Sequence, residues 1–245
     1  MNKTAIIIPS RLNALRLPNK PLKLINNKEM ILHVYEAAKK TNAGEVYVAT
    51  PDQKIIDVIN NNGGKAVLTS LEHQTGTDRI YEVFQTQLKN EPNIIVNLQG
   101  DMPNIDPKAI SDLVSYMGEG QCDIGTLASS FNSESELADE NNVKVSIKKK
   151  THDSNFVEAI DFLRNTLNTN ENFYHHIGIY AFTNKALVRY VSLERSKLEL
   201  ERNLEQLRAL ENNMSIHVGL INSLPLSVDT EKDLIEVKKI MENNE

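Results

Sequence analysis

The chain has 245 residues, of which 40% are hydrophobic and 24% are charged, and this balance excludes a fibrous or disordered protein. Its net charge of -6 argues against a general nucleic-acid-binding protein, which neutralises phosphates with many Lys and Arg side chains. The single cysteine, Cys122, excludes an intrachain disulfide. The apolar run near Met1 is too short for a signal peptide or a membrane helix, so we expect a cytoplasmic protein.

The first half of the chain alternates short β-branched runs with amphipathic stretches, which is typical of βα units around a mostly parallel sheet. The expected strands span residues 5–8, 46–49, 66–69 and 94–98. Between them, apolar residues recur at helical spacing in segments 30–38, 55–59 and 80–88. This half of the chain therefore predicts an α/β fold.

The second half has a different pattern after about residue 120. Strand-like segments follow one another with little helix between them, at residues 124–131, 143–147, 156–162 and 177–182. Segments 132–142 and 148–155 have no apolar period and predict surface loops, and a closing helix begins near Glu231. No linker separates two domains, so we expect a single domain over residues 1–245, with one part to about residue 120 and a mixed or antiparallel part over about 121–225.

Ligands of open α/β sheets bind at the carboxyl ends of the strands, so the loops after the predicted strands are the candidates for chemistry. The loop over residues 9–22 places Arg11, Arg16 and Lys20 together in an acidic chain, which suits a polyphosphate. The loop matches neither the Walker nor the dinucleotide-binding glycine pattern. The simpler interpretation is solvated surface charge, although the position after the first strand favours a site.

A carboxylate follows the strand at 94–98 in the sequence NLQGD, which ends at Asp101. Mg²⁺ is often held by one or two carboxylates together with substrate phosphate oxygens, and Asp229 could supply the second carboxylate. Each aspartate alone has a structural alternative, because Asp101 suits a turn and Asp229 suits the cap of the closing helix.

The segment HQTGTDR, residues 73–79, places a glycine between hydroxyl residues before a helix and could offer backbone donors to a base or a ribose. Its structural alternative is a helix N-terminus capped by Thr77 or Asp78. His175 and His176 begin a strand, where adjacent side chains face opposite sides, so at most one of them faces a ligand.

Taken in order, seven motifs resemble the 3-deoxy-manno-octulosonate (Kdo) cytidylyltransferase family, also called CMP-Kdo synthetases. The motifs are IIPSRLNALRLPNKPL, VAT at 48–50, TGTDR at 75–79, NLQGD at 97–101, HHIGIY at 175–180, LEQLR at 204–208 and VDT at 228–230. The resemblance implies a Rossmann-like nucleotidyltransferase fold of GT-A type, with a mostly parallel central sheet and a smaller mixed subdomain. It also implies a homodimer and a closing helix that returns to the first part.

The implied reaction joins CMP from CTP to the anomeric hydroxyl of Kdo, for lipopolysaccharide biosynthesis, with Mg²⁺ as cofactor. The resemblance assigns catalysis to Arg11, Lys20, Asp101 and Asp229, with the two aspartates binding the metal. It implies that the nucleotide is bound by Arg11, Arg16, Lys20, Thr50, Thr75, Gly76, Arg79 and Gln99. It implies that the sugar is bound by Arg164, His176, Tyr180, Glu199 and Gln206.

The chain departs from the family pattern at Ala14 and Asn19 in the first loop, although Asn tolerates the positive φ that a glycine would adopt there. Four further departures lie toward the expected sugar site, at Met102, Leu163, His175 and Arg202. They leave open a cytidylyltransferase for 8-amino-Kdo or another nonulosonic acid. A nucleotide-binding protein without catalysis and a sugar-1-phosphate nucleotidyltransferase are further alternatives.

Overall fold

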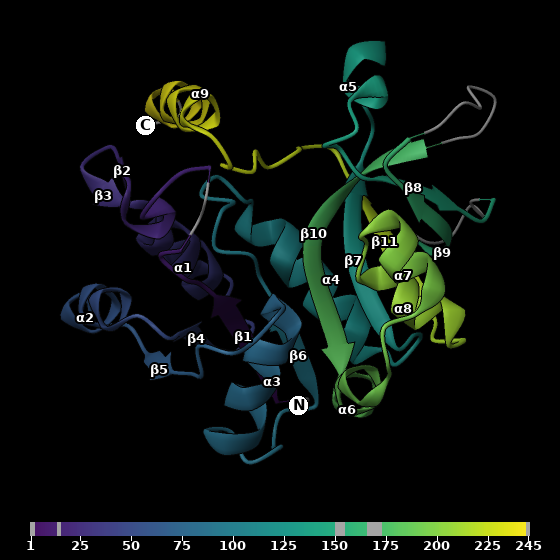
Figure 1. Ribbon diagram of the computed structural model, residues 1–245, viewed down its shortest axis with the longest axis horizontal. Helices are drawn as coiled ribbons and strands as arrows, with labels where there is room; N and C mark the ends of the chain where they lie inside the picture. Colours follow the sequence, from purple (N-terminus) through teal and green to yellow (C-terminus); the bar gives the residue numbers. More distant parts are fainter. Residues whose placement is uncertain (1–2, 14–15, 150–154, 166–172, 244–245) are drawn as a thin grey trace. The chain divides into compact units, whose positions relative to one another are not determined.

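The computed structural model describes residues 3–13, 16–149, 155–165 and 173–243 (Figure 1). The chain divides into two compact units, one formed by Met1–Val114 with Pro225–Glu245 and the other by Ser115–Leu224. The single domain over residues 1–245, with parts that change at about residues 120 and 225, stays a prediction. Ala14 falls outside the described residues.

The first unit is built on four parallel strands in the order β5-β4-β1-β6. The strands are β1 (Thr4–Pro9), β4 (Glu45–Thr50), β5 (Ala66–Leu68) and β6 (Ile94–Asn97). Every residue of β1 and β6 is buried, as continuous apolar runs in a covered sheet require. The connecting helices are α1 (Met30–Lys40), α2 (Gln53–Asn61) and α3 (Gly76–Thr86). All four strands and three helices that the sequence predicted here are confirmed.

The closing helix, α9 (Glu231–Glu242), belongs to the first unit. Its Leu234 and Val237 pack with Ile25 and Met30 in one buried cluster, which also contains Leu17 and Val228. Ile25 lies in a small hairpin formed by β2 (Leu24–Ile25) and β3 (Lys28–Glu29), after the 3-10 helix η1 (Lys20–Leu22). This packing brings the segment before α9 to the loop after β1.

The second unit has a mixed sheet in the order β10-β7-β11-β9-β8, and β8 also pairs with β10. Its strands are β7 (Ile124–Ser129), β8 (Lys144–Ile147), β9 (Phe156–Leu163), β10 (Phe173–Thr183) and β11 (Ile216–Ile221). Only the β11–β7 pair is parallel among these pairings. The expected mixture of directions is therefore confirmed, while β11 was not predicted. The α/β class of the chain is confirmed as well.

Several helices escaped the sequence analysis. They are α4 (Pro107–Gly118), which leads from the first unit into the second, α5 (Glu134–Ala138), α6 (Asn184–Ser192), α7 (Lys197–Arg202) and α8 (Gln206–Glu211). The prediction that 132–142 is entirely loop was wrong, because Ser133 caps α5 by accepting a hydrogen bond from the Glu136 amide. No residue of α5 is buried, so it has no apolar period to detect. In the predicted loop 148–155, residues 150–154 lie outside the described residues.

None of the helices in the described part of the chain is both long and apolar enough to cross a lipid bilayer.

Candidate active site

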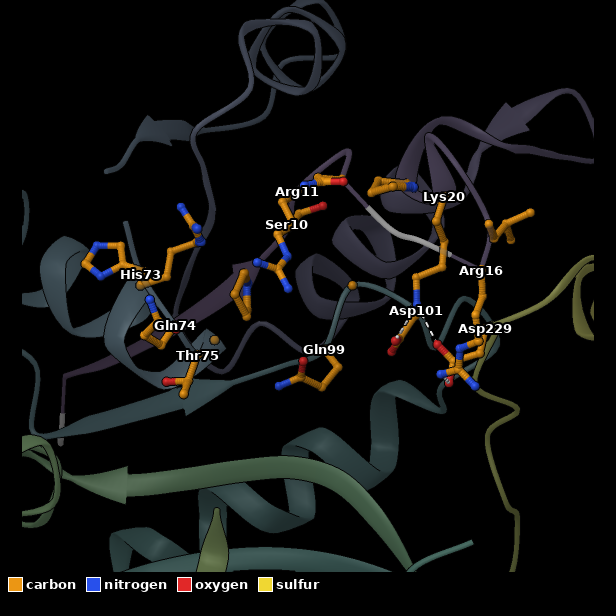
Figure 2. A pocket seen from close by; sticks show the side chains of 17 residues that line it. Ser10, Arg11, Arg16, Lys20, His73, Gln74, Thr75, Gln99, Asp101 and Asp229 are labelled. Atoms are coloured by element: carbon orange, nitrogen blue, oxygen red, sulfur yellow. Dashed lines mark hydrogen bonds and ion pairs between the residues drawn. The ribbon is translucent and has the colours of Figure 1, made fainter. Parts of the chain in front are cut away.

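A cavity of about 610 Å³ lies in the first unit at the carboxyl ends of β1 and β6 (Figure 2). Its volume is typical of small-molecule sites, and its position is the one expected for ligands of parallel sheets. The lining comes from the loop after β1, the start of α3, the loop after β6 and the segment before α9. Nine of the predicted site residues line it: Arg11, Arg16, Lys20, Thr75, Gly76, Arg79, Gln99, Asp101 and Asp229.

The loop after β1 is held in place by hydrogen bonds from its backbone amides to the neighbouring strand and to a side chain in the loop after that strand. The Ser10 amide donates to the Ala49 carbonyl at 2.9 Å, and the Leu12 amide donates to Asp52 Oδ2 at 2.8 Å. Asn19 adopts φ 56° at the start of η1, so this position has the positive φ that asparagine tolerates. These contacts direct the basic side chains of the loop into the cavity.

Lys20 lies between two carboxylates that come from distant parts of the chain. Its Nζ is 2.9 Å from Asp101 Oδ2 and 3.0 Å from Asp229 Oδ1, and Arg16 Nη2 is 2.9 Å from Asp229 Oδ2 (Figure 2). Burial lowers the pKa of Lys20, but the two carboxylates outweigh it and the pKa is raised overall. We call Arg16, Lys20, Asp101 and Asp229 the charged cluster.

Asp229 is not the cap of α9, so that structural alternative was wrong. Thr230 is the N-cap, with its side chain accepting from the Asp233 amide, and Asp233 in turn accepts from the Thr230 amide. The Asp229 carboxylate is therefore available to the charged cluster. The Val228 amide donates to the Asp101 carbonyl at 2.9 Å, which fixes the segment before α9 beside the loop after β6.

The start of α3 forms another part of the wall. Thr75, and not Thr77 or Asp78 as the structural alternative assumed, caps the helix in a reciprocal capping box with Asp78. Gly76 lies close to Pro9, since a Cβ atom there would be 3.1 Å from Pro9 Cγ. The positive end of the α3 dipole is consequently exposed to the cavity, where it favours an anion.

Two guanidinium groups line the cavity near the start of α3. Arg79 is buried, and it donates to Thr69 Oγ1 and, at 2.9 Å, to the Ser70 carbonyl. Burial lowers the pKa of Arg79, and the positive charge of Arg11 lowers it further. An anionic ligand between these groups would relieve that repulsion, so this part of the cavity suits phosphate groups.

His73, Gln74 and Thr75 lie at the start of α3, on the side of the cavity away from Asp101 and Asp229 in Figure 2. Gln99 donates from Nε2 to Asn97 Oδ1 at 3.0 Å. Ser10 is only 8% exposed, and its Oγ has no hydrogen-bond partner within the described part of the chain. The cavity thus offers uncharged hydrogen-bonding groups next to a strongly charged region, as a nucleotide needs.

The donor set fits a hard divalent cation. Asp101 and Asp229 already converge on one cationic group, the Lys20 ammonium, and carboxylate oxygens are the ligands that Mg²⁺ prefers. No cluster of three or more His, Cys, Asp or Glu side chains suited to a metal occurs among the described residues. Two carboxylates are sufficient for Mg²⁺ when substrate phosphates complete its coordination.

Comparisons with known proteins agree with this geometry. A cytidylyltransferase family model matches residues 5–216. A 3-deoxy-manno-octulosonate cytidylyltransferase of Bartonella henselae is 41% identical over 239 residues, covering 96% of this chain and 97% of the relative. One from Rickettsia bellii is 42% identical over 242 residues, covering 98% of this chain and 96% of the relative. The chain belongs to the 3-deoxy-manno-octulosonate cytidylyltransferase family.

Solved structures agree with this family membership. A CMP:2-keto-3-deoxy-manno-octonic acid synthetase complexed with CTP aligns with a TM-score of 0.90 and 34% identity, covering 99% of this chain and all of that chain. A 4-diphosphocytidyl-2C-methyl-D-erythritol synthase from Anaerococcus prevotii aligns with a TM-score of 0.65 at 12% identity and supports the fold alone. The resemblance that the seven motifs indicated is confirmed.

Six residues that the family resemblance assigned to ligands do not line the cavity. Thr50 is fully buried, and its Oγ1 accepts a hydrogen bond from the Asp52 amide at 3.1 Å. The five residues assigned to the sugar belong to the second unit: Arg164, His176, Tyr180, Glu199 and Gln206. The His176 and Tyr180 rings lie 5.4 Å apart, and Arg164 Nη1 donates to the Glu140 carbonyl at 3.2 Å.

Of these five residues, Glu199 has the hydrogen-bonding groups that are most fully paired. Its carboxylate is completely buried and accepts two hydrogen bonds from Arg208, at 2.8 and 2.6 Å, and one from Arg195 at 3.1 Å. Burial raises the pKa of Glu199, but the hydrogen bonds from Arg208 and Arg195 lower it below its ordinary value. Its oxygens therefore already have structural partners.

The positions where this chain departs from the family pattern have distinct surroundings. Arg202 Nη1 lies 2.8 Å from both carboxylate oxygens of Asp161, so its charge is balanced within the second unit. His175 stacks on Phe131 with ring centroids 5.0 Å apart. Met102 is buried in the first unit, and Leu163 is partly exposed at the end of β9.

Four polar residues of the cavity were not among the predicted site residues: Ser10, Asn13, His73 and Gln74. They are neighbours of predicted residues in the same loops, and that adjacency was the available signal. Whether each of these side chains reaches the cavity depends on how its loop folds. Short sequence motifs do not specify the conformation of a loop.

Proposed function

We propose that the protein transfers CMP from CTP to the anomeric hydroxyl of Kdo and releases pyrophosphate. The main support for this proposal is the cavity. Two carboxylates and four basic side chains line it where the parallel strands end. Membership of the 3-deoxy-manno-octulosonate cytidylyltransferase family supplies the substrate class. The CTP complex of a structural relative supports the choice of nucleotide.

In this reaction the anomeric hydroxyl oxygen attacks the α-phosphorus of CTP, the bond to the β-phosphate oxygen breaks, and the hydroxyl proton is released. The protein forms no covalent intermediate, so its residues act by positioning and by charge. Arg11, Arg79 and Lys20 would hold the triphosphate and neutralise the negative charge that develops on the leaving pyrophosphate. The buried position of Arg79 keeps its guanidinium fixed during this step.

We propose Asp101 and Asp229 as the residues that hold Mg²⁺. When bound, Mg²⁺ supplies electrostatic stabilisation of phosphate oxygens and lowers the pKa of a coordinated hydroxyl. The two carboxylates are fixed for this role by the Val228–Asp101 backbone hydrogen bond and by the capping of α9 through Thr230. Arg16 and Lys20 balance their charge in the protein alone.

The proposal extends to the remaining family properties. These are a GT-A type of nucleotidyltransferase fold, a cytoplasmic homodimer, a place in lipopolysaccharide biosynthesis, and sugar contacts from Arg164, His176, Tyr180, Glu199 and Gln206. The similarity over nearly the full length of named relatives supports them. Thr50 would act on the nucleotide indirectly, because its buried side chain accepts a hydrogen bond from the Asp52 amide.

Pyrophosphate release from the purified protein tests the function. We expect release with CTP, Mg²⁺ and Kdo together, and none when any of the three is omitted. Asp101→Asn should lower kcat by about 100- to 1000-fold, as loss of a key electrostatic contact does, while circular dichroism stays unchanged. Release with UTP or with a sugar 1-phosphate in place of these substrates would contradict the proposal.

The departures at Met102, Leu163, His175 and Arg202 justify 8-amino-Kdo as a second substrate in the same assay. A higher kcat/KM for the amino sugar would make it the preferred acceptor and these positions its specificity determinants. CTP binding without pyrophosphate release from either sugar would support a binding protein instead.

A further inference from the structure

Lys20 occupies the position between the two carboxylates at which a cation binds best. Its ammonium contacts Asp101 at 2.9 Å and Asp229 at 3.0 Å, and its side chain is only 16% exposed. Arg16 adds a second positive charge 2.9 Å from the other oxygen of Asp229. Two carboxylates thus meet two cationic side chains, and the charged cluster is neutral in the protein alone (Figure 2).

A divalent cation held by Asp101 and Asp229 would compete with the Lys20 ammonium for the same oxygens. Two positive centres that share two carboxylates repel each other strongly in a partly buried site. Entry of a metal therefore requires Lys20 to leave at least one of its partners. Without another anion nearby, the displaced ammonium would have no compensating charge, and this cost weakens metal binding.

A triphosphate supplies the missing anion. The lysine stem has four flexible carbons and an ammonium with three rotatable donors, so Nζ can move while the backbone of η1 stays in place. Arg11, Arg79 and the N-terminus of α3 line the same cavity and form its anion-binding part. Phosphate groups held there would accept hydrogen bonds from Lys20 and leave the carboxylates to the metal.

We propose that Lys20 makes metal binding at Asp101 and Asp229 depend on CTP, by occupying the carboxylate pair until the triphosphate draws its ammonium away. The identities of metal and nucleotide rest on the proposed function. Because coupling between two ligands is reciprocal, CTP raises the affinity for the metal by the same factor as the metal raises the affinity for CTP. Lys20 thereby favours joint binding of the two over binding of the metal alone.

Arg16 provides a matched comparison within the charged cluster. It carries the same charge as Lys20, but its side chain is 62% exposed and it contacts Asp229 without contacting Asp101. Removing Arg16 takes one positive charge from the site and leaves Lys20 between the carboxylates. The two substitutions therefore separate displacement of Lys20 from a general change of charge.

The first measurement is Mn²⁺ binding to the protein without nucleotide, read by electron paramagnetic resonance. We expect Lys20→Gln to bind Mn²⁺ at least about fivefold more tightly than the wild type, the lower end of typical coupling between two ligands. Lys20→Arg should bind like the wild type, and Arg16→Gln should show a smaller gain than Lys20→Gln. Lys20→Met serves as the second neutral variant if Lys20→Gln does not fold by circular dichroism.

The second measurement is CTP affinity by calorimetry with and without Mn²⁺, corrected for Mn²⁺ binding to free CTP. The factor by which Mn²⁺ strengthens CTP binding should be smaller in Lys20→Gln than in the wild type. Absence of CTP binding would contradict the proposed function, while the Mn²⁺ series would still test Lys20. Equal Mn²⁺ affinity in the wild type and Lys20→Gln, or equal gains in Lys20→Gln and Arg16→Gln, would overturn the inference.

Discussion

Whether a side chain of this site is available to a ligand depends on which neighbouring residue caps the adjacent helix. Thr230 caps α9, so Asp229 can join the charged cluster, and Thr75 caps α3, so the following residues can face the cavity. Ser10 is a similar case, because its backbone amide has a structural partner and its hydroxyl has none among the described residues. Ser10 lines the cavity and its amide is bonded to Ala49, whereas its Oγ is buried without a partner in the described part of the chain.

Ser10→Ala should weaken CTP binding by about 2- to 12-fold, the equivalent of one hydrogen bond worth about 0.5–1.5 kcal/mol. The reason is that a bound nucleotide would give the hydroxyl its partner. The protein without ligand should be as stable as the wild type or slightly more stable, because an unpaired buried hydroxyl is removed. Calorimetry with CTP and urea unfolding measure the two effects.

Ser192→Ala is a suitable control, since Ser192 lies in α6 of the second unit and its hydroxyl donates to the Arg189 carbonyl. It should leave CTP affinity unchanged. If Ser10→Ala bound CTP as tightly as the wild type, Ser10 would have no contact with the nucleotide.

Among the helices, a buried ion pair connects two elements that are too short to be stable alone. Helices α7 and α8 have six residues each, well below the length at which an isolated helix persists in water. The Glu199 carboxylate in α7 receives both hydrogen bonds of the Arg208 guanidinium in α8. Arg208 also lies over the Tyr190 ring, 4.7 Å from its centroid.

Glu199→Gln should lower the free energy of unfolding by about 3–5 kcal/mol, because the Arg208 charge stays buried without its counter-ion. Glu201→Gln on the same helix is the matched control, since Glu201 is exposed and its nearest cation, Lys197, is 3.7 Å away. It should change stability by less than about 1 kcal/mol. Urea unfolding of both variants measures the difference.

The same pair of variants tests the sugar contact that the family resemblance assigned to Glu199. Loss of Kdo binding with unchanged stability would support a direct contact and would contradict the structural role of the Glu199–Arg208 pair.

At the scale of the whole molecule, one buried histidine and two half-buried ones make the stability of the fold depend on pH. His176 is buried in β10, with Nε2 2.9 Å from Thr126 Oγ1, and burial lowers its pKa from the ordinary 6.5 to about 3. Burial also lowers the pKa of His175 and of His217. The unfolded chain therefore binds more protons than the folded chain over the mildly acidic range.

For His176 the stabilising contribution is complete above about pH 6.5, and it falls as the pH decreases from 6.5 toward 3. The slope from this one group should approach about 1.4 kcal/mol per pH unit. His176→Gln cannot bind a proton, so its unfolding free energy should fall less steeply between pH 6 and pH 4. Urea unfolding at several pH values measures both slopes, and equal slopes would contradict the assignment to His176.

Much of this protein could be predicted from local sequence patterns. Apolar runs and helical spacing predicted β1, β4, β5, β6 and the three helices between them, because those elements bury one continuous face or stripe. The order of the seven motifs indicated the family. Helix α5 has no buried residue and carries no such period, so it was missed. Helix α4 was missed although Ile110, Leu113 and Met117 are buried at helical spacing.

Tertiary structure alone decided how the site is assembled. The Lys20 ammonium meets Asp101 and Asp229, which are 81 and 209 residues away in the sequence, and no local pattern specifies such distances. Whether Asp229 caps a helix or faces the cavity depends on the hydrogen bonds of Thr230 and Asp233. The sequence by itself determined which chemical groups are present and in what order, whereas packing decided which of them meet, because ion pairs and burial depend on contacts between distant segments.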